Sequence, residues 1–79
     1  MEDLTSLVEY VAKSLVSDPD AVRVEAQQRG RTVAITLVVP PEEMGKVIGR
    51  QGRVARSLRT MLAIGATQHR LRASLDIHD

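Results

Sequence analysis

An alternating segment, residues 32–39, constrains the fold of this chain more than any other feature. Every second position carries a large apolar side chain: Val33, Ile35, Leu37 and Val39. A period of two places these side chains on one face of an extended strand, and β-branched residues favour that conformation. Pro40-Pro41 follows at once, and proline cannot extend a strand ladder. We therefore predict a strand with one buried face that ends at this pair.

Two further segments show the same period. In residues 22–27, the apolar side chains are Val22, Val24 and Ala26, and Gly30 then marks a turn. We predict a hairpin between this strand and residues 32–39. In residues 70–77, the apolar positions are Leu71, Ala73, Leu75 and Ile77, which predicts a last, half-buried strand.

Three segments have helical character. Residues 4–15 place apolar side chains at helical spacing, and this helix should stop near residues 17–19. Pro41 with Glu42 and Glu43 is a good helix opening, which predicts a short helix to about Val47. A longer helix is predicted from Gly52 onward. Its expected buried stripe is Val54, Leu58, Met61, Leu62 and Gly65, and the glycine is expected to cap the helix.

These elements give the order α-β-β-α-α-β, in which helices pack on one face of a three-stranded sheet as an α+β domain. The 79 residues suit a single domain, residues 1–79, with a modest core that a partner subunit would help to bury. The chain has no cysteine, which excludes disulfides and thiol-based sites and suits a reducing cytoplasm. No stretch approaches the ~20 apolar residues of a membrane span, so we expect a soluble, unprocessed cytoplasmic protein.

Charge is distributed unevenly along the sequence. The net charge is only +1, yet residues 1–43 hold four cations against eight acids, and residues 44–79 hold seven cations against two acids. The first part therefore carries −4 and the second +5. This asymmetry is expected of a local anion site on an otherwise acidic protein, with a solvated charged surface as the simpler alternative.

Two glycines three positions apart lie between the last two predicted helices. The run is Val47-Ile48-Gly49-Arg50-Gln51-Gly52-Arg53. Glycine permits positive φ and lets a ligand approach without a Cβ in the way. The nearby arginines and the positive end of the following helix favour an anion here. A turn of this kind can hold a phosphate backbone.

The stretch Met44-Gly45-Lys46-Val47-Ile48-Gly49-Arg50-Gln51-Gly52 resembles the signature of K-homology (KH) domains, whose Gly-x-x-Gly (GxxG) loop joins two helices and clamps about four nucleotides. With its element order, the chain resembles the type II KH fold, which has a three-stranded mixed sheet, and in particular the small bacterial single-KH RNA-binding proteins of the KhpA/YlqC type. The resemblance implies non-enzymatic binding of single-stranded RNA, as a bacterial RNA chaperone or post-transcriptional regulator, with no cofactor or metal.

The same resemblance assigns residues to the site. Gly49, Arg50, Gln51 and Gly52 form the clamp. The full set of RNA-binding residues that we expect is Lys46, Ile48, Gly49, Arg50, Gln51, Gly52, Arg53, Arg56, Arg70 and Arg72. As charge donors, Lys46 and Arg53 should add affinity without choosing a sequence. Ile48 is expected to be groove wall, core or both. Arg70 and Arg72 lie on the strand that should close the groove, where contact with water alone is an equal alternative. Arg59 is expected to be a surface cation.

Other nucleic-acid or phosphate patterns fit less well. The P-loop motif, G-x-x-x-x-G-K-[ST], does not match, because its second glycine must be followed by lysine and Gly49 is followed by Arg50. The dinucleotide-binding fingerprint G-x-G-x-x-G is absent from the sequence. A helix-turn-helix would leave the hairpin and the final strand unexplained. Tyr10 is the only aromatic residue, which nearly excludes modules that stack bases on rings. Single-stranded DNA in place of RNA stays open.

An enzyme is not expected, because no nucleophile with a base, carboxylate pair or metal cluster has a recognisable spacing. Met61 and Ile64 lie on the flank of the long predicted helix and form an apolar edge. Such an edge on a small chain predicts a protein contact, either a homodimer or a pair with another KH-containing protein. The alternative function is therefore an interaction module that keeps the fold and works by dimerising or docking.

Overall fold

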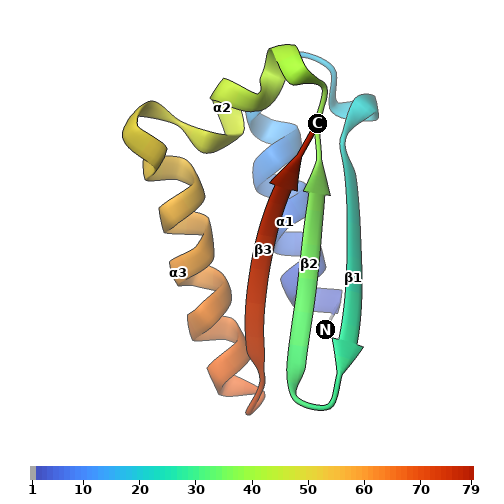
Figure 1. Ribbon diagram of the computed structural model, residues 1–79, viewed down its shortest axis with the longest axis vertical. Helices are drawn as coiled ribbons and strands as arrows, with labels where there is room; N and C mark the ends of the chain where they lie inside the picture. Colours follow the sequence, from blue (N-terminus) through green and yellow to red (C-terminus); the bar gives the residue numbers. More distant parts are fainter. Residues whose placement is uncertain (1) are drawn as a thin grey trace.

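The computed structural model describes residues 2–79 and confirms the predicted order of elements (Figure 1). The helices are α1 (Glu2–Leu15), α2 (Met44–Ile48) and α3 (Arg53–Gln68), and the strands are β1 (Arg23–Arg29), β2 (Thr32–Val38) and β3 (Arg72–His78). Three short 3-10 turns, Pro19–Ala21, Pro41–Glu43 and Arg50–Gly52, precede β1, α2 and α3. The short helix expected from Pro41 thus begins as a 3-10 turn that leads into α2.

The sheet is mixed, as expected. Its strand order is β1-β2-β3, with β1 antiparallel and β3 parallel to β2. A two-residue turn, Gly30-Arg31, joins the hairpin, and the φ of +59° at Gly30 is of the kind that glycine-first hairpin turns require. The parallel pairing needs a crossover, and α2 and α3 supply it. All three helices lie on one face of the sheet, so the other face is open (Figure 1).

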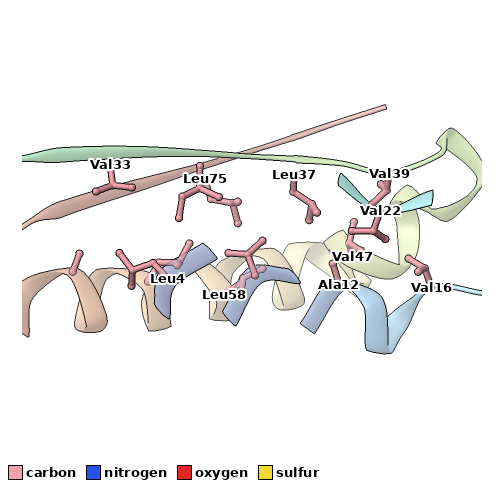
Figure 2. Packing of buried hydrophobic residues seen from close by; sticks show 14 residues of the cluster. Leu4, Ala12, Val16, Val22, Val33, Leu37, Val39, Val47, Leu58 and Leu75 are labelled. Atoms are coloured by element: carbon pink, nitrogen blue, oxygen red, sulfur yellow. The ribbon is translucent and has the colours of Figure 1, made fainter. Parts of the chain in front are cut away.

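The hydrophobic core fills the space between the covered face of the sheet and the helices (Figure 2). The predicted alternation in β2 is confirmed, because its apolar side chains are almost fully buried while the intervening ones are not. The largest fully buried side chains are Ile35, Leu37, Leu58, Leu62, Val8, Val33, Val39 and Val47. Burial of each of these side chains stabilises the fold by about 1.5–3 kcal/mol. A one-residue slip of β2 would turn its apolar side chains away from α1 and α3, so their burial fixes the register of this strand.

Two predictions for α3 were wrong. Its buried stripe consists of Ala55, Leu58, Leu62 and Ala66, whereas Met61 is 41% exposed. Gly65 does not cap the helix, since α3 continues to Gln68. A Cβ at Gly65 would lie 2.8 Å from Cδ2 of Leu4, so this glycine lets α1 and α3 approach closely.

The end of α3 is fixed by a different residue. Arg70 has a φ of +58°, and its N–H donates to the carbonyl of Thr67 at 3.0 Å. The N–H of Leu71 donates to the carbonyl of Ala66 at 2.8 Å. These two bonds are those of a Schellman motif, with arginine at the left-handed position that glycine usually occupies.

Candidate nucleic-acid interface

The Gly49–Gly52 loop projects at the junction of α2 and α3, at the yellow part of the chain in Figure 1. Three of its residues have positive φ: Gly49 at +78°, Gln51 at +56° and Gly52 at +74°. The N–H of Gly49 closes α2 on the carbonyl of Gly45 at 2.9 Å, and the N–H of Gly52 returns to the carbonyl of Gly49 at 3.1 Å. The loop is therefore a compact turn with a defined backbone.

This turn leaves two amides for a ligand. Among the described residues, neither the N–H of Arg50 nor that of Gln51 has a backbone carbonyl as partner. Both side chains are exposed. Free amides and a cation beside the N-terminus of α3, a helix of 16 residues, form a favourable environment for a phosphate.

The two glycines serve different purposes. A Cβ at Gly49 would lie 2.5 Å from Cγ2 and 2.9 Å from the backbone nitrogen of Val54, so a larger residue cannot fit there without moving the start of α3. A Cβ at Gly52 would meet nothing closer than 3.9 Å, at Nη2 of Arg56. Gly49 is thus required for close packing inside the loop, and Gly52 is required mainly for its left-handed backbone.

Arg56 holds the loop in place. Its Nη2 donates to the carbonyl of Gln51 at 2.5 Å, across the turn. The side chain is exposed, so it can also face a ligand beside the loop. Arg56 was predicted as an RNA contact, and its bond to the loop was not foreseen.

A groove of about 390 Å³ runs beside the loop, between the first half of α3 and the end of β3. Its apolar lining comes from Ile48, Ala55 and Ile77. The polar residues that line it are Gln51, Arg56, Arg59 and Asp76, together with Gly52. Ile48 lines this groove and also packs against the core.

Arg59, Ala55, Asp76 and Ile77 line this groove but were not among the predicted site residues, and Arg59 was expected to be a surface cation. Its Nε and Nη2 donate to the carbonyl of Leu75 at 3.3 and 3.1 Å, which ties α3 to the free edge of β3. The spacing of three residues after Arg56 was visible in the sequence. Its partner was not, because the carbonyl belongs to a strand 16 residues away.

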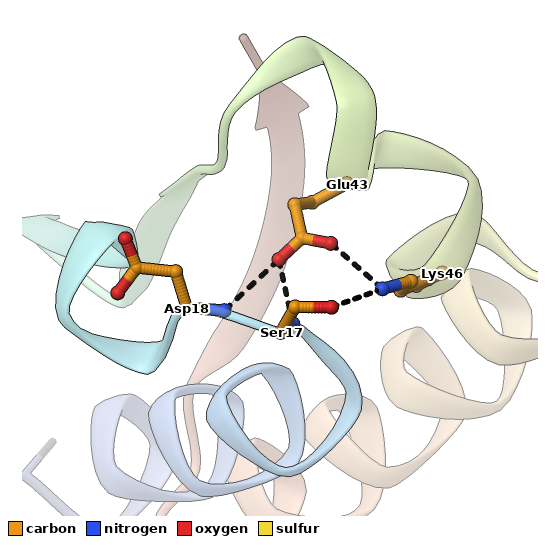
Figure 3. Close-up of polar contacts among 4 residues, drawn as sticks. All are labelled: Ser17, Asp18, Glu43 and Lys46. Carbon is orange, nitrogen blue, oxygen red and sulfur yellow. Dashed lines mark hydrogen bonds and ion pairs between the residues drawn. The ribbon is translucent and has the colours of Figure 1, made fainter.

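Lys46 is anchored in a polar cluster on the other side of α2 (Figure 3). Glu43, only 5% exposed, accepts hydrogen bonds from the N–H groups of Ser17 at 2.6 Å and Asp18 at 3.1 Å. Lys46 pairs with this carboxylate at 2.8 Å and donates to the hydroxyl of Ser17 at 2.6 Å. The cluster fixes the start of α2 to the end of α1, and so positions the loop that follows.

The same contacts lower the pKa of Glu43. The largest cause is the hydrogen bond from Lys46, which outweighs the desolvation that acts in the opposite direction. The N–H groups of Asp18 and Ser17 lower the pKa further. Glu43 is therefore charged in the folded protein at neutral pH, and its charge is locally neutralised.

The structure separates the predicted site residues into two groups. Lys46, Ile48, Arg53 and Arg56 lie on α2 and α3 around the loop. Arg70 and Arg72 lie at the opposite end of α3 and β3, and the groove is lined by Asp76 and Ile77 of β3 instead (Figure 1). The two predicted contact residues on α3, Met61 and Ile64, are exposed by 41% and 58%.

Among the side chains that the structure describes, residues 3–79, no group of three or more His, Cys, Asp or Glu residues could hold a metal ion. No helix in this range has the length and apolar character needed to cross a bilayer.

A type II KH domain is the class of protein that this fold and site define: an αββααβ domain with a mixed three-stranded sheet and a GxxG loop between two helices on its covered face. Residues 5–77 match the family described as KhpA/KhpB, KH domain. The chain belongs to this family.

Individual relatives agree. The chain is 46% identical over 76 residues to the RNA-binding protein KhpA of Halalkalibacterium halodurans, covering 96% of this chain and 100% of that protein. It is 54% identical over 66 residues to the RNA-binding protein KhpA of Aquifex aeolicus, covering 82% and 84%. Among solved structures, Aquifex aeolicus Era superposes with a TM-score of 0.65 at 12% identity over 95% of this chain. The chain corresponds to only 30% of Era, and this likeness shows the fold alone.

Proposed function

We propose that the chain binds single-stranded RNA by clamping the sugar-phosphate backbone at the Gly49–Gly52 loop. The observation that carries the proposal is the loop itself, where the amides of Arg50 and Gln51 lack backbone partners and Arg50 places a cation beside them. Curated relatives that match 96% and 82% of this chain are named RNA-binding proteins, which supports RNA as the ligand.

The groove supplies the second half of the proposed site. The bases lie against Ile48, Ala55 and Ile77, while Arg56 and Arg59, on α3, face the RNA strand. Apolar walls suit the flat faces of bases in a chain whose only aromatic side chain, Tyr10, lies on α1 and does not line this groove. Arg53 contributes positive charge at the flank of the loop without choosing a sequence, and Lys46 contributes less because its ammonium group is paired with Glu43.

The test replaces Arg50 and Gln51 with aspartate and measures binding of a short unstructured RNA at several salt concentrations. Aspartate tolerates the left-handed backbone of Gln51, so the variant should keep its fold. We expect wild-type binding that weakens as salt rises and a folded variant that barely binds.

A matched control is available on the open face of the sheet. Arg23 and Gln27 are an arginine and a glutamine, both exposed, on β1. Replacing both with aspartate changes the net charge by the same amount as the loop variant. This control should bind a five-nucleotide RNA, which spans little more than the loop, nearly as the wild type does, and equal loss in both variants would contradict a local clamp.

RNA binding of this kind suits a cytoplasmic RNA chaperone or post-transcriptional regulator, which is the role we propose. A deoxyribonucleotide strand of the same sequence tests the alternative ligand. If DNA binds as tightly as RNA, the site does not read the 2′-hydroxyl and the ligand class widens to single strands in general.

We also propose that α3 carries a contact for a second copy or for another KH-containing protein. Ile64 lies on the solvent side of α3 and Met61 beside it, and a shallow apolar hollow of about 290 Å³ reaches from Met61 to Leu15 of α1. Exposed apolar surface of this kind marks protein contacts. Sedimentation should show a dimer that Ile64→Asp dissociates and Gln27→Asp does not. A strict monomer at high micromolar concentration, unchanged by Ile64→Asp, would remove the homodimer.

A further inference from the structure

Two turns that are distant in sequence meet at the end of the domain opposite the loop. One is the hairpin turn Gly30-Arg31, and the other is the α3-to-β3 turn around Arg70; both lie at the bottom of Figure 1. The N–H of Arg72 donates to the carbonyl of Arg31 at 2.7 Å and fastens the two turns together. We call the four arginines gathered here the basic pole: Arg29, Arg31, Arg70 and Arg72.

The strand register places two of these arginines in one row. Arg29 pairs with Thr32, and Thr32 pairs with Arg72, so both arginine side chains lie on the open face of the sheet. Strands are ~4.8 Å apart, so the two backbones are about 10 Å apart. A hollow of about 350 Å³ lies next to them, and its lining is Gln27, Arg29, Thr32 and Ala34.

The positive charge of the basic pole has no acidic partner in the sheet rows around it. The next row along the open face is Gln27, Ala34 and Ser74, and the first carboxylates come one row later, at Glu25 and Asp76. Among residues 3–79, whose side chains the structure describes, the ion pairs are Lys13–Glu9 and Lys46–Glu43, on α1 and at α2. All four arginines of the pole are exposed.

Helix capping accounts for part of the pole only. Cations after the last turn of α3 complement its dipole, which gives Arg70 and Arg72 a structural reason. The reason does not extend to Arg29 and Arg31, which belong to the hairpin. Arg70 also occupies a left-handed position that glycine adopts more easily, so the arginine lies there in spite of an unfavourable backbone conformation.

We propose that the basic pole is a second phosphate-binding site for the same RNA strand that the loop clamps, an inference that rests on the proposed function. Guanidinium groups are well suited to phosphate, and contacts of this kind add affinity without reading sequence. A docked protein would be expected to use apolar anchors. The exposed large apolar side chains of the described chain, Tyr10, Leu15, Met61 and Ile64, all lie on α1 and α3 and none belongs to the hairpin or to β3; Ile64, near the end of α3, is the nearest of them to the pole along the chain.

The dimensions set the length of RNA that reaches both sites. The 16 residues of α3 separate loop and pole by about 24 Å at 1.5 Å per residue. At ~3.4 Å per stacked nucleotide, this distance corresponds to about seven nucleotides. A strand of five nucleotides clamped at the loop therefore stops short of the pole, and one of twelve reaches it.

The experiment measures binding of a 5-mer and a 12-mer of unstructured RNA to the wild type and to R29Q/R31Q over a range of salt concentrations. Each lost phosphate contact on a single strand lowers the slope of log K against log salt by about 0.7. For the 12-mer, we expect the magnitude of this slope to be about 1.4 smaller in the double variant than in the wild type. The ratio of wild-type to variant affinity should therefore grow about 25-fold for each tenfold fall in salt concentration. The 5-mer should bind both proteins equally.

The control compares R29Q with R23Q, which are single changes on the same face of β1 at its two ends. R29Q should lower the 12-mer slope and R23Q should not, with thermal melts showing that both variants are folded. A 12-mer slope unchanged in R29Q/R31Q would overturn the second site while leaving the loop clamp intact, and would favour an acidic protein as the ligand of the pole. Equal weakening of the 5-mer and the 12-mer would also overturn it. A wild type that binds neither strand would refute the clamp and the pole together.

Discussion

Replacing each glycine of the loop with alanine should have very unequal costs. At Gly52, φ is +74° and ψ is 16°, and an added Cβ meets nothing within 3.4 Å. The cost is the left-handed backbone alone, roughly 1–2 kcal/mol, reduced by up to about 1 kcal/mol because alanine restricts the unfolded chain. We expect Gly52→Ala to lower the free energy of unfolding by about 1 kcal/mol.

At Gly49, two penalties act together. Its φ of +78° with ψ of 170° belongs to a region that only glycine populates readily, which costs about 1–3 kcal/mol. The added Cβ also overlaps Val54 at 2.5 Å and 2.9 Å, and overpacking of this kind costs about 1–3 kcal/mol. The sum is about 4 kcal/mol, a large part of the roughly 4–12 kcal/mol expected for a domain of this length.

Urea denaturation followed by circular dichroism measures both changes. A double-mutant cycle with Val54→Ala adds a sharper test, because that change removes the methyl group 2.5 Å away but leaves the backbone nitrogen at 2.9 Å. We expect partial rescue, with the double variant about 1–2 kcal/mol more stable than the sum of the single changes predicts. Equal costs at Gly49 and Gly52, or strict additivity with Val54→Ala, would refute the described loop conformation.

Three further predictions concern the scaffold and the groove. Because the pKa of Glu43 is lowered in the folded state, its stabilising effect is complete above the ordinary carboxyl pKa and is lost as pH falls through the lowered value. Urea midpoints between pH 7 and pH 3 should therefore fall less steeply for Glu43→Gln, and parallel curves would contradict this. Arg70→Gly should raise the free energy of unfolding by about 1 kcal/mol, because glycine suits the left-handed C′ position; a loss of stability would show that the side chain contributes more than the backbone costs. Arg59→Gln should weaken binding of a short RNA in an anisotropy titration while the protein stays folded. An unchanged affinity would show that Arg59 does not contribute to RNA binding.

Periodicity in the sequence predicted the elements well because large apolar side chains mark buried faces unambiguously. It located the buried face of β2 and predicted the hairpin with its antiparallel neighbour, whereas the mixed sheet was expected only from the resemblance to the type II KH fold. The stripe of α3 was misjudged because two of its four buried positions, Ala55 and Ala66, are alanines. Small side chains are buried without giving a strong signal, so the predicted stripe turned toward Met61.

The position of the glycine loop was predicted from the sequence, but the side chains that hold the loop and the groove in place were not. The spacing of Gly49 and Gly52 indicated positive φ, but nothing local indicated that Gln51 would share it. The bonds of Arg56 to the loop and of Arg59 to β3 depend on how α3 lies against its neighbours. Contacts between side chains and remote carbonyls carry no sequence period, so they become visible only in three dimensions.

The most direct test of the account is a map of backbone amides in a titration of isotopically labelled protein with a five-nucleotide RNA. We predict that the largest and earliest shifts fall on the amides of Arg50 and Gln51 and continue along the first turns of α3 and the end of β3. Shifts centred on Ile64 and Met61, with the loop amides unchanged, would contradict a phosphate clamp and would establish the chain as an interaction module.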